Sequence, residues 1–162
     1  RLLTRSAAPY SKPRILAAID PGAHGLRGAA LDAGIVGRAA AMAEATDGSV
    51  GVVHCVREPP LGLATRAATQ RRERARVQAM VRQVARGAGL RRRDARIVDG
   101  NPVDVLLDAV NEEGADILAM GTVVRGPIRQ MLIGSTTEQL MHVAPCDLLL
   151  VKPDSVRFAV RK

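Results

Sequence analysis

The order in which apolar segments follow one another is the feature that most restricts how this chain can fold. Short apolar runs alternate with longer segments whose apolar residues recur at helical spacing. The predicted strands are 14–20, 50–56, 96–98, 116–120 and 147–151, and the predicted helices are 25–45, 64–87, 102–114 and 135–144. Strands that are almost entirely apolar and are separated by helices form parallel sheets covered on both faces. The sequence therefore predicts an α/β domain with a doubly wound, five-stranded parallel sheet and helices on both faces.

A sheet of this kind has a ligand crevice at the carboxyl ends of its strands. The segment 121–136 leaves a predicted strand there, passes Gly126 and two arginines, and enters a helix. Residues 122–133 lack periodicity and are predicted to be mostly loop, and Ser135 to Glu138 fit a capping box. A helix N-terminus offers unpaired N–H groups and a positive dipole end to a phosphate. The alternative is a plain connection in which Ser135 caps the helix through its own side chain.

The charge of the chain favours a solvated helix over a nucleic-acid surface. The net charge is +8, and eleven of the 21 arginines fall between Arg66 and Arg96. A basic patch for phosphate backbones is one interpretation of that cluster. With one Tyr, one Phe and no Trp, however, the chain has almost no aromatic platform on which bases could stack. We therefore do not expect nucleic acid among its partners.

Length and motif content suggest one intracellular domain. The chain of 162 residues is long enough for a sizeable core, and we expect a linker or N-terminal arm at 1–12, the α/β domain at 13–155 and a tail at 156–162. Its apolar runs are too short to span a bilayer, and no pattern signals secretion. Cys55 and Cys146 lack clustered partners, which favours reduced thiols over a disulfide or a metal site. The expected location is the cytoplasm.

Several segments resemble a known family. The run from Ala119 to Gly121, followed by Gly134-Ser135, matches the first and last parts of the pattern Gly-x2-Gly-x9-Gly-[Ser/Thr] at the correct separation. The segments 15–20, 53–56, 100–102 and 144–151 add further similarity. Over about residues 13 to 155 the chain therefore resembles the universal stress proteins. The stretches 121–123 and 151–154 look most like their tandem-domain branch.

The resemblance implies a site for ATP or a related adenine nucleotide, with Mg²⁺ possible beside it. The residues implicated by position are Asp20 at the base, the backbone of Val56, and Gly121, Gly134, Ser135 and Thr136 around ribose and phosphates. Val124 departs from the motif because it stands where the second glycine belongs. A β-branched residue resists positive φ, and its Cβ hinders close approach of backbone to ligand. Gly126 could relieve the loop, although it lies in a different register.

The residues do not assemble a catalytic set. The three lysines, Lys12, Lys152 and Lys162, leave the glycine-containing segment without a Walker-type lysine. His54 alternates with apolar residues and is expected to be a packed core histidine. We therefore expect a stress-response, nucleotide-sensing module without strong catalysis. A nucleotide-free dimeric interaction protein and a weak ATPase or adenylyl transferase remain open as alternatives.

The resemblance also implies how the chain associates. The family's strand order is 3-2-1-4-5, which places the last strand at an edge of the sheet. An exposed apolar edge at 148–151 favours pairing with another chain. The expected partner is a second copy that forms a homodimer through this edge strand, or a tandem domain.

Overall fold

The computed structural model describes residues 2–3, 10–21, 25–57, 67–91, 94–124, 131–132 and 134–153. Its main sheet contains five parallel strands, namely β2 (Arg14–Ala18), β3 (Ser49–Val56), β4 (Ala95–Asp99), β5 (Ile117–Gly121) and β8 (Asp147–Val151). The order β4-β3-β2-β5-β8 is the predicted 3-2-1-4-5 arrangement. Because β2 and β5 are neighbours, the sheet reverses its winding between them, and this is where a crevice opens in such folds.

A sixth strand, β1 (Leu2–Leu3), lies outside β8 and runs antiparallel to it. The sequence prediction that β8 forms an uncovered edge is therefore wrong for part of this strand. Leu2 pairs with Leu149 and Leu3 pairs with Leu148. A two-residue strand leaves no periodic signal, so only the long-range pairing identifies it.

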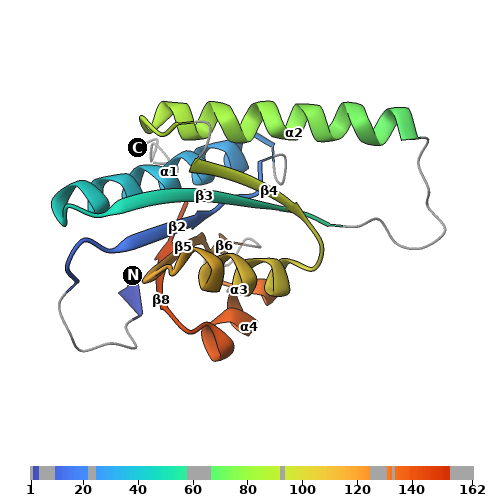
Figure 1. Ribbon diagram of the computed structural model, residues 1–162. Helices are drawn as coiled ribbons and strands as arrows, with labels where there is room; N and C mark the ends of the chain where they lie inside the picture. Colours follow the sequence, from blue (N-terminus) through green and yellow to red (C-terminus); the bar gives the residue numbers. More distant parts are fainter. Residues whose placement is uncertain are drawn as a thin grey trace, which may run out of the picture.

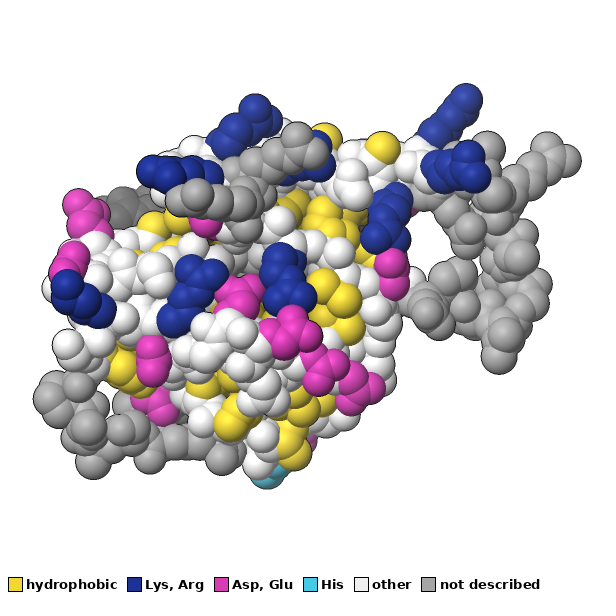
Figure 2. All heavy atoms as spheres, in the orientation of Figure 1, with side chains coloured by type: hydrophobic (Ala, Val, Ile, Leu, Met, Phe, Trp, Pro, Cys, Tyr) yellow, Lys and Arg dark blue, Asp and Glu magenta, His cyan; other side chains and the backbone are white. Residues whose placement is uncertain are grey.

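Helices cover both faces of the sheet (Figure 1). They are α1 (Gly25–Ala45), α2 (Ala67–Gly87), α3 (Pro102–Glu113) and α4 (Ser135–Val143). The helices α1 and α2 lie on one face, and α3 and α4 lie on the other. The solvent side of α2 is rich in arginine, and Lys and Arg side chains gather along the top of the molecule in Figure 2, over this helix. None of the described helices is long and apolar enough to cross a membrane.

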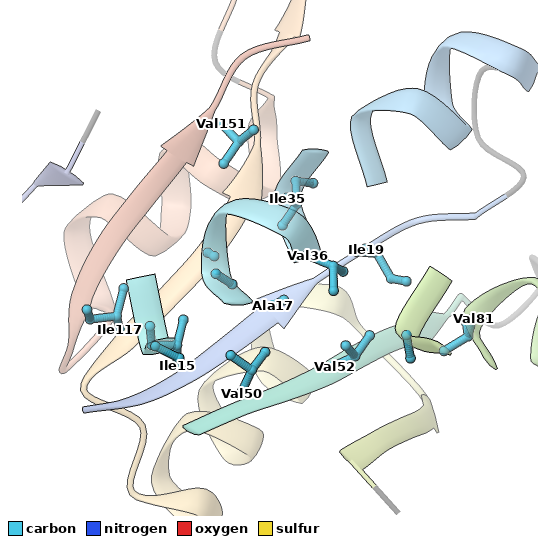
Figure 3. Packing of buried hydrophobic residues seen from close by; sticks show 14 residues of the cluster. Ile15, Ala17, Ile19, Ile35, Val36, Val50, Val52, Val81, Ile117 and Val151 are labelled. Carbon is cyan, nitrogen blue, oxygen red and sulfur yellow. The ribbon is translucent and has the colours of Figure 1, made fainter. Parts of the chain in front are cut away.

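The core consists of two layers of side chains, one on each face of the sheet. On the first face, Ile35 and Val36 of α1 lie over Ile15 and Ala17 of β2, and all four are almost fully buried (Figure 3). On the second face, side chains of α3 and α4 pack on alternate residues of the same strands. Because helices pack on both faces of the same strands, the core holds the carboxyl ends of these strands in place, and the crevice lies there.

Local signals agree with the boundaries of α3. Asn101 is its N-cap, and the Asn101 side-chain oxygen accepts a hydrogen bond from the Val103 amide at 2.9 Å. Pro102 is the first helical residue, as its fixed φ favours. Gly114 ends the helix with φ of 57°, a left-handed conformation that suits glycine.

The segment after β5 differs from the predicted loop. Two short strands, β6 (Val123–Val124) and β7 (Met131–Leu132), pair antiparallel, and Val124 lies opposite Met131. The prediction of a loop missed this hairpin because two-residue strands carry no readable period. Gly126 lies outside the described residues.

Candidate functional site

A pocket of about 290 Å³ lies at the carboxyl ends of the parallel strands. This volume is near the lower end of the range for small-molecule sites, about 300 to 1,000 Å³. The pocket is lined by Ala18, Ile19, Asp20, Gly28, Leu31, Asp32, Ile35, Val53, Cys55, Arg57, Pro102, Leu106, Met120, Gly121, Gly134, Ser135, Thr136 and Thr137. These residues come from β2, β3, β5 and their flanking loops and from three helices, so the pocket lies where the winding of the sheet reverses.

Most of the residues implicated by sequence meet in this pocket. Asp20, Gly121, Gly134, Ser135 and Thr136 all line it. Val124 lies in β6, of which only the backbone is described, and Gly126 is outside the described residues.

Val56 is the one fully described candidate that does not line the pocket, although its neighbours Cys55 and Arg57 do. Its carbonyl oxygen accepts a hydrogen bond from the Gly100 amide at 3.0 Å. That bond ties the end of β3 to the loop after β4, so the carbonyl of Val56 already has a protein partner.

The N-terminus of α4 forms one wall of the pocket. The N-cap is Gly134, with φ of −64° and ψ of 152°, so the predicted capping by Ser135 is wrong. Ser135 is instead the first helical residue, and a glycine N-cap has no side chain to accept from the first-turn amides. The exposed hydroxyl of Ser135 and those amides therefore stand beside the pocket with the positive end of the helix dipole.

Gly121 brings the end of β5 close to α1. A Cβ at this position would lie 2.8 Å from Leu31 Cδ2 and 3.2 Å from Ile35 Cδ1. A Cβ here would have to displace the ends of these two side chains, so glycine lets β5 pack closely against α1. The carbonyl of Gly121 also accepts a hydrogen bond from the Thr137 hydroxyl at 3.5 Å, which connects β5 to α4.

Acidic groups gather at the end of β2. The side chain of Asp20 is 67% exposed, whereas Asp32 on α1 is only 3% exposed. Asp32 Oδ1 accepts a hydrogen bond from the Asp20 amide at 3.0 Å, which fixes the turn after β2. Sequence reasoning missed Asp32, and its position one turn before the buried Ile35 and Val36 was the available signal.

His54 is buried, as the sequence predicted, and contacts the same turn after β2. Its Nδ1 lies 3.0 Å from the carbonyl oxygen of Ile19 and 3.9 Å from Asp20 Oδ1. A carbonyl oxygen can only accept, so this ring nitrogen carries the hydrogen and donates. The histidine thus holds the carbonyl of Ile19, the residue before Asp20.

Cys55 also lines the pocket and was not predicted to do so. Burial raises the pKa of the Cys55 thiol, which Arg57 opposes and Asp20 and Asp99 reinforce. The protonated thiol donates a hydrogen bond to the Gly100 carbonyl at 3.2 Å. A thiol that stays protonated at neutral pH is a poor nucleophile, so this cysteine contributes surface to the pocket and no obvious reactivity.

The described residues contain no group of three or more His, Cys, Asp or Glu side chains that could hold a metal ion.

Comparison with known proteins decides the family. Residues 13–152 match the model of the universal stress protein family. The chain belongs to this family. The likeness read from the sequence is therefore confirmed, and so is the α/β arrangement that it implied.

Two relatives illustrate the range of the family. A universal stress protein from Thermus aquaticus is 32% identical over 145 residues, which cover 85% of this chain and 97% of the relative. Universal stress protein E of Escherichia coli is 33% identical over 72 residues, which cover 44% of this chain and 23% of that protein. The first is of similar length, whereas the second is much longer than the aligned region.

Solved structures also differ in how much of their length this chain covers. A functionally unknown protein from Pseudomonas aeruginosa has a TM-score of 0.77 and 25% identity, and the match covers 94% of this chain and 52% of that one. The chain thus spans about half the length of this structure. A universal stress protein solved in complex with cAMP has a TM-score of 0.60 and 21% identity, with 89% and 99% coverage. This second likeness establishes the fold alone.

Proposed function

We propose that this chain is a nucleotide-sensing module of the stress response that binds ATP or a related adenine nucleotide and has little or no catalytic activity. The observation that carries the proposal is that Asp20 and the glycine-capped start of α4 line the same pocket. One side offers an exposed carboxylate to a polar base, and the other offers backbone amides and a dipole to an anion. A nucleotide needs both ends.

Each residue has a role that follows from its place. Asp20 accepts hydrogen bonds from the base in this proposal, since its amide is held by Asp32 while its carboxylate, 3.9 Å from His54 Nδ1, is largely exposed at the pocket. Ser135 and Thr136 donate to phosphate oxygens, and Gly121 lets the nucleotide approach the strand end. A relative of the same fold was solved in complex with cAMP, an adenine nucleotide, which is consistent with this class of ligand.

Mg²⁺ accompanies the nucleotide in this proposal and is held chiefly by its phosphates, because the described residues lack a ligand cluster of their own. The same residues lack a positioned base or nucleophile for phosphoryl transfer, so weak ATPase or adenylyl transferase activity is the less favoured alternative. The proposed location is the cytoplasm, where the nucleotide and reduced thiols are both expected.

Isothermal titration with ATP, ADP, AMP and cAMP tests the proposal. Ser135→Glu places a carboxylate at the proposed phosphate position, and we expect it to weaken binding at least about tenfold, or about 1.4 kcal/mol. Gln139→Glu is the matched control, since it adds the same charge to an exposed position of the same helix. Absence of heat with all four nucleotides, or equal losses in both variants, would reject the site.

Alkylation of Cys55 gives an independent measurement. In a Cys146→Ala background, the rate should rise with pH along a curve whose midpoint lies above that of an ordinary cysteine thiol, because burial raises the pKa of Cys55. Saturating ATP should slow the reaction, since Cys55 lines the pocket. Equal rates with and without ATP, where titration detects binding, would place the nucleotide elsewhere.

ATP binding by the Val124→Gly variant distinguishes the nucleotide-binding hypothesis from the nucleotide-free alternative. Glycine at this position restores the family motif and removes the β-branched side chain. If ATP binds only to the variant, the natural protein works without nucleotide. If both bind, the valine is compatible with the ligand.

We also propose that β8 pairs with a partner, which is a second copy in a homodimer or, alternatively, a tandem domain. The support is the apolar sequence Leu148 to Val151 in a strand near the end of the sheet. Within the described residues β1 covers two positions of that edge, so the dimer must compete with it.

A further inference from the structure

The outer edge of β8 is a surface that accepts an antiparallel strand. Every other strand of the described main sheet pairs in parallel, whereas β1 pairs antiparallel with β8. Two identical edge strands related by a two-fold axis through the sheet also run antiparallel to each other. In direction, β1 therefore occupies this edge as β8 of a second copy would.

The sequences of the two strands support the same comparison. β1 consists of two leucines, and the residues opposite them, Leu148 and Leu149, are also leucines. A partner β8 would offer the same residue type to this edge, because it reads Asp-Leu-Leu-Leu-Val. The N-terminal segment thus carries a short copy of the pattern that a second chain would bring.

A second contact holds the other end of this segment. The hydroxyl of Tyr10, the only tyrosine in the chain, donates a hydrogen bond to Asp147 Oδ2. Asp147 is the first residue of β8 and is 2% exposed. Tyr10 is partly buried against the core layer of α1. The segment from Leu2 to Tyr10 is therefore attached to β8 at two places.

Only one strand can use this edge at a time, because an edge presents a single row of N–H and C=O groups. β1 engages two residues of β8, whereas a second β8 has five residues, Asp147–Val151, with which to pair. The short strand compensates by being tethered, which gives it a high effective concentration. The outcome of the competition therefore depends on protein concentration.

We propose that β1 and the β8 strand of a second copy compete for the outer edge of β8, so that the N-terminal arm sets the concentration at which the protein dimerises. This inference rests on the dimerisation proposed above and adds its control. Anything that loosens the arm promotes the dimer, and anything that fixes the arm favours the single chain.

The test is the molar mass of the full chain by light scattering over a wide range of protein concentration. The double variant Leu2→Pro, Leu3→Pro removes both amide donors of β1. We expect it to show the mass of two chains at concentrations where the unmodified protein shows the mass of one. Ser6→Pro is the matched control, since it adds proline to the same arm outside β1, and it should behave as the unmodified protein.

Two outcomes would overturn the inference, and they are distinguishable. If the double variant folds but stays a single chain at every concentration, β8 does not accept a second copy, and the proposed dimer fails as well. If both proteins dimerise equally, the dimer stands but the arm does not compete. In the double variant, Leu149→Lys should restore the single chain, because it places a charge on the edge.

Tyr10→Phe gives a second test that does not depend on proline. Loss of the Tyr10–Asp147 hydrogen bond releases the other attachment of the arm, so the dimer should form at lower protein concentration than in the unmodified protein. An unchanged concentration dependence would show that this contact has no part in the competition and would overturn the role given to the arm.

Discussion

β4 and β8, the parallel strands at the two ends of the main sheet, are protected from pairing with other chains in different ways. β4 ends the sheet on one side with half-buried residues and the exposed Asp99, and its charges are paired locally. β8, near the other end, is buried along nearly its whole length and is covered by another strand instead. An edge with unpaired backbone groups invites association, and charges or covering strands both prevent it. This difference indicates that a partner strand would pair at the β8 side of the sheet and not at β4.

The charges of β4 are held by specific pairs. Arg96 Nη2 lies 2.8 Å from Glu112 Oε2, and Arg96 Nη1 lies 3.6 Å from Glu113 Oε1. The hydrogen bond to Glu112 raises the pKa of Arg96, so this edge keeps its positive charge at every ordinary pH. Arg74 of α2 contacts both carboxylate oxygens of Asp99 at 2.6 Å.

The largest expected effect concerns the packing of the two edges. Leu148 in β8 is 4% exposed, whereas Ile97 in β4 is half-buried. Leu148→Ala should lower the free energy of unfolding by about 2 to 5 kcal/mol, because it leaves a cavity in the core. Ile97→Ala should cost less, and urea denaturation followed by circular dichroism compares them. Equal losses would mean that the two edges are equally part of the core.

The next effect concerns the attachment of the arm to β8. Tyr10→Phe removes a hydrogen bond to a buried carboxylate, which should cost about 1.5 to 3 kcal/mol of unfolding free energy. A double-mutant cycle with Asp147→Asn isolates the coupling between the two side chains. Additive losses in the cycle would mean that the contact does not stabilise the fold.

A smaller effect on stability is expected at β4, together with a change in association. Arg96→Val should alter the free energy of unfolding by less than about 1 kcal/mol, since exposed ion pairs contribute little. It also removes a charge that protects the edge, so light scattering should detect larger species. Arg96→Lys keeps the charge and serves as the control. If Arg96→Val remains a single species, the charge is not what protects this edge.

The smallest effect is expected for the pair on the surface of α2. Arg74→Gln breaks the contact with Asp99, in which both side chains are 44% exposed and which is screened by salt. Neither the urea midpoint nor the molar mass should change measurably at physiological ionic strength. A clear loss of stability would indicate that Arg74 anchors α2 to β4.

The local signals of the sequence specified most of this fold. The helical period of small residues predicted 25–45, which are the bounds of α1, and each parallel strand was found from its apolar run. The pocket was also predicted in outline, since Asp20, Gly121 and the start of α4 follow strand ends that must meet at one edge.

What the sequence missed required knowledge of distant neighbours. β1 pairs across more than a hundred residues with β8, and two leucines carry no signal of that pairing. The capping box at Ser135 was misassigned because the chain enters α4 through Gly134, which is the N-cap. The position of Asp32 before Ile35 and Val36 suggests burial, but its hydrogen bond with the Asp20 amide exists only once α1 packs on that turn.

The sequence by itself therefore determined the number and order of the parallel strands, the helices between them and the family. The strands and helices depend on short-range periodicity, which each segment expresses on its own, whereas the family and its strand order came from the resemblance of the glycine-containing motif and further segments. The tertiary structure decided which edge of the sheet is covered, which groups cap the helix at the pocket and which acids are buried. Those properties depend on contacts between segments far apart in the chain, and their free energy arises only when the segments meet.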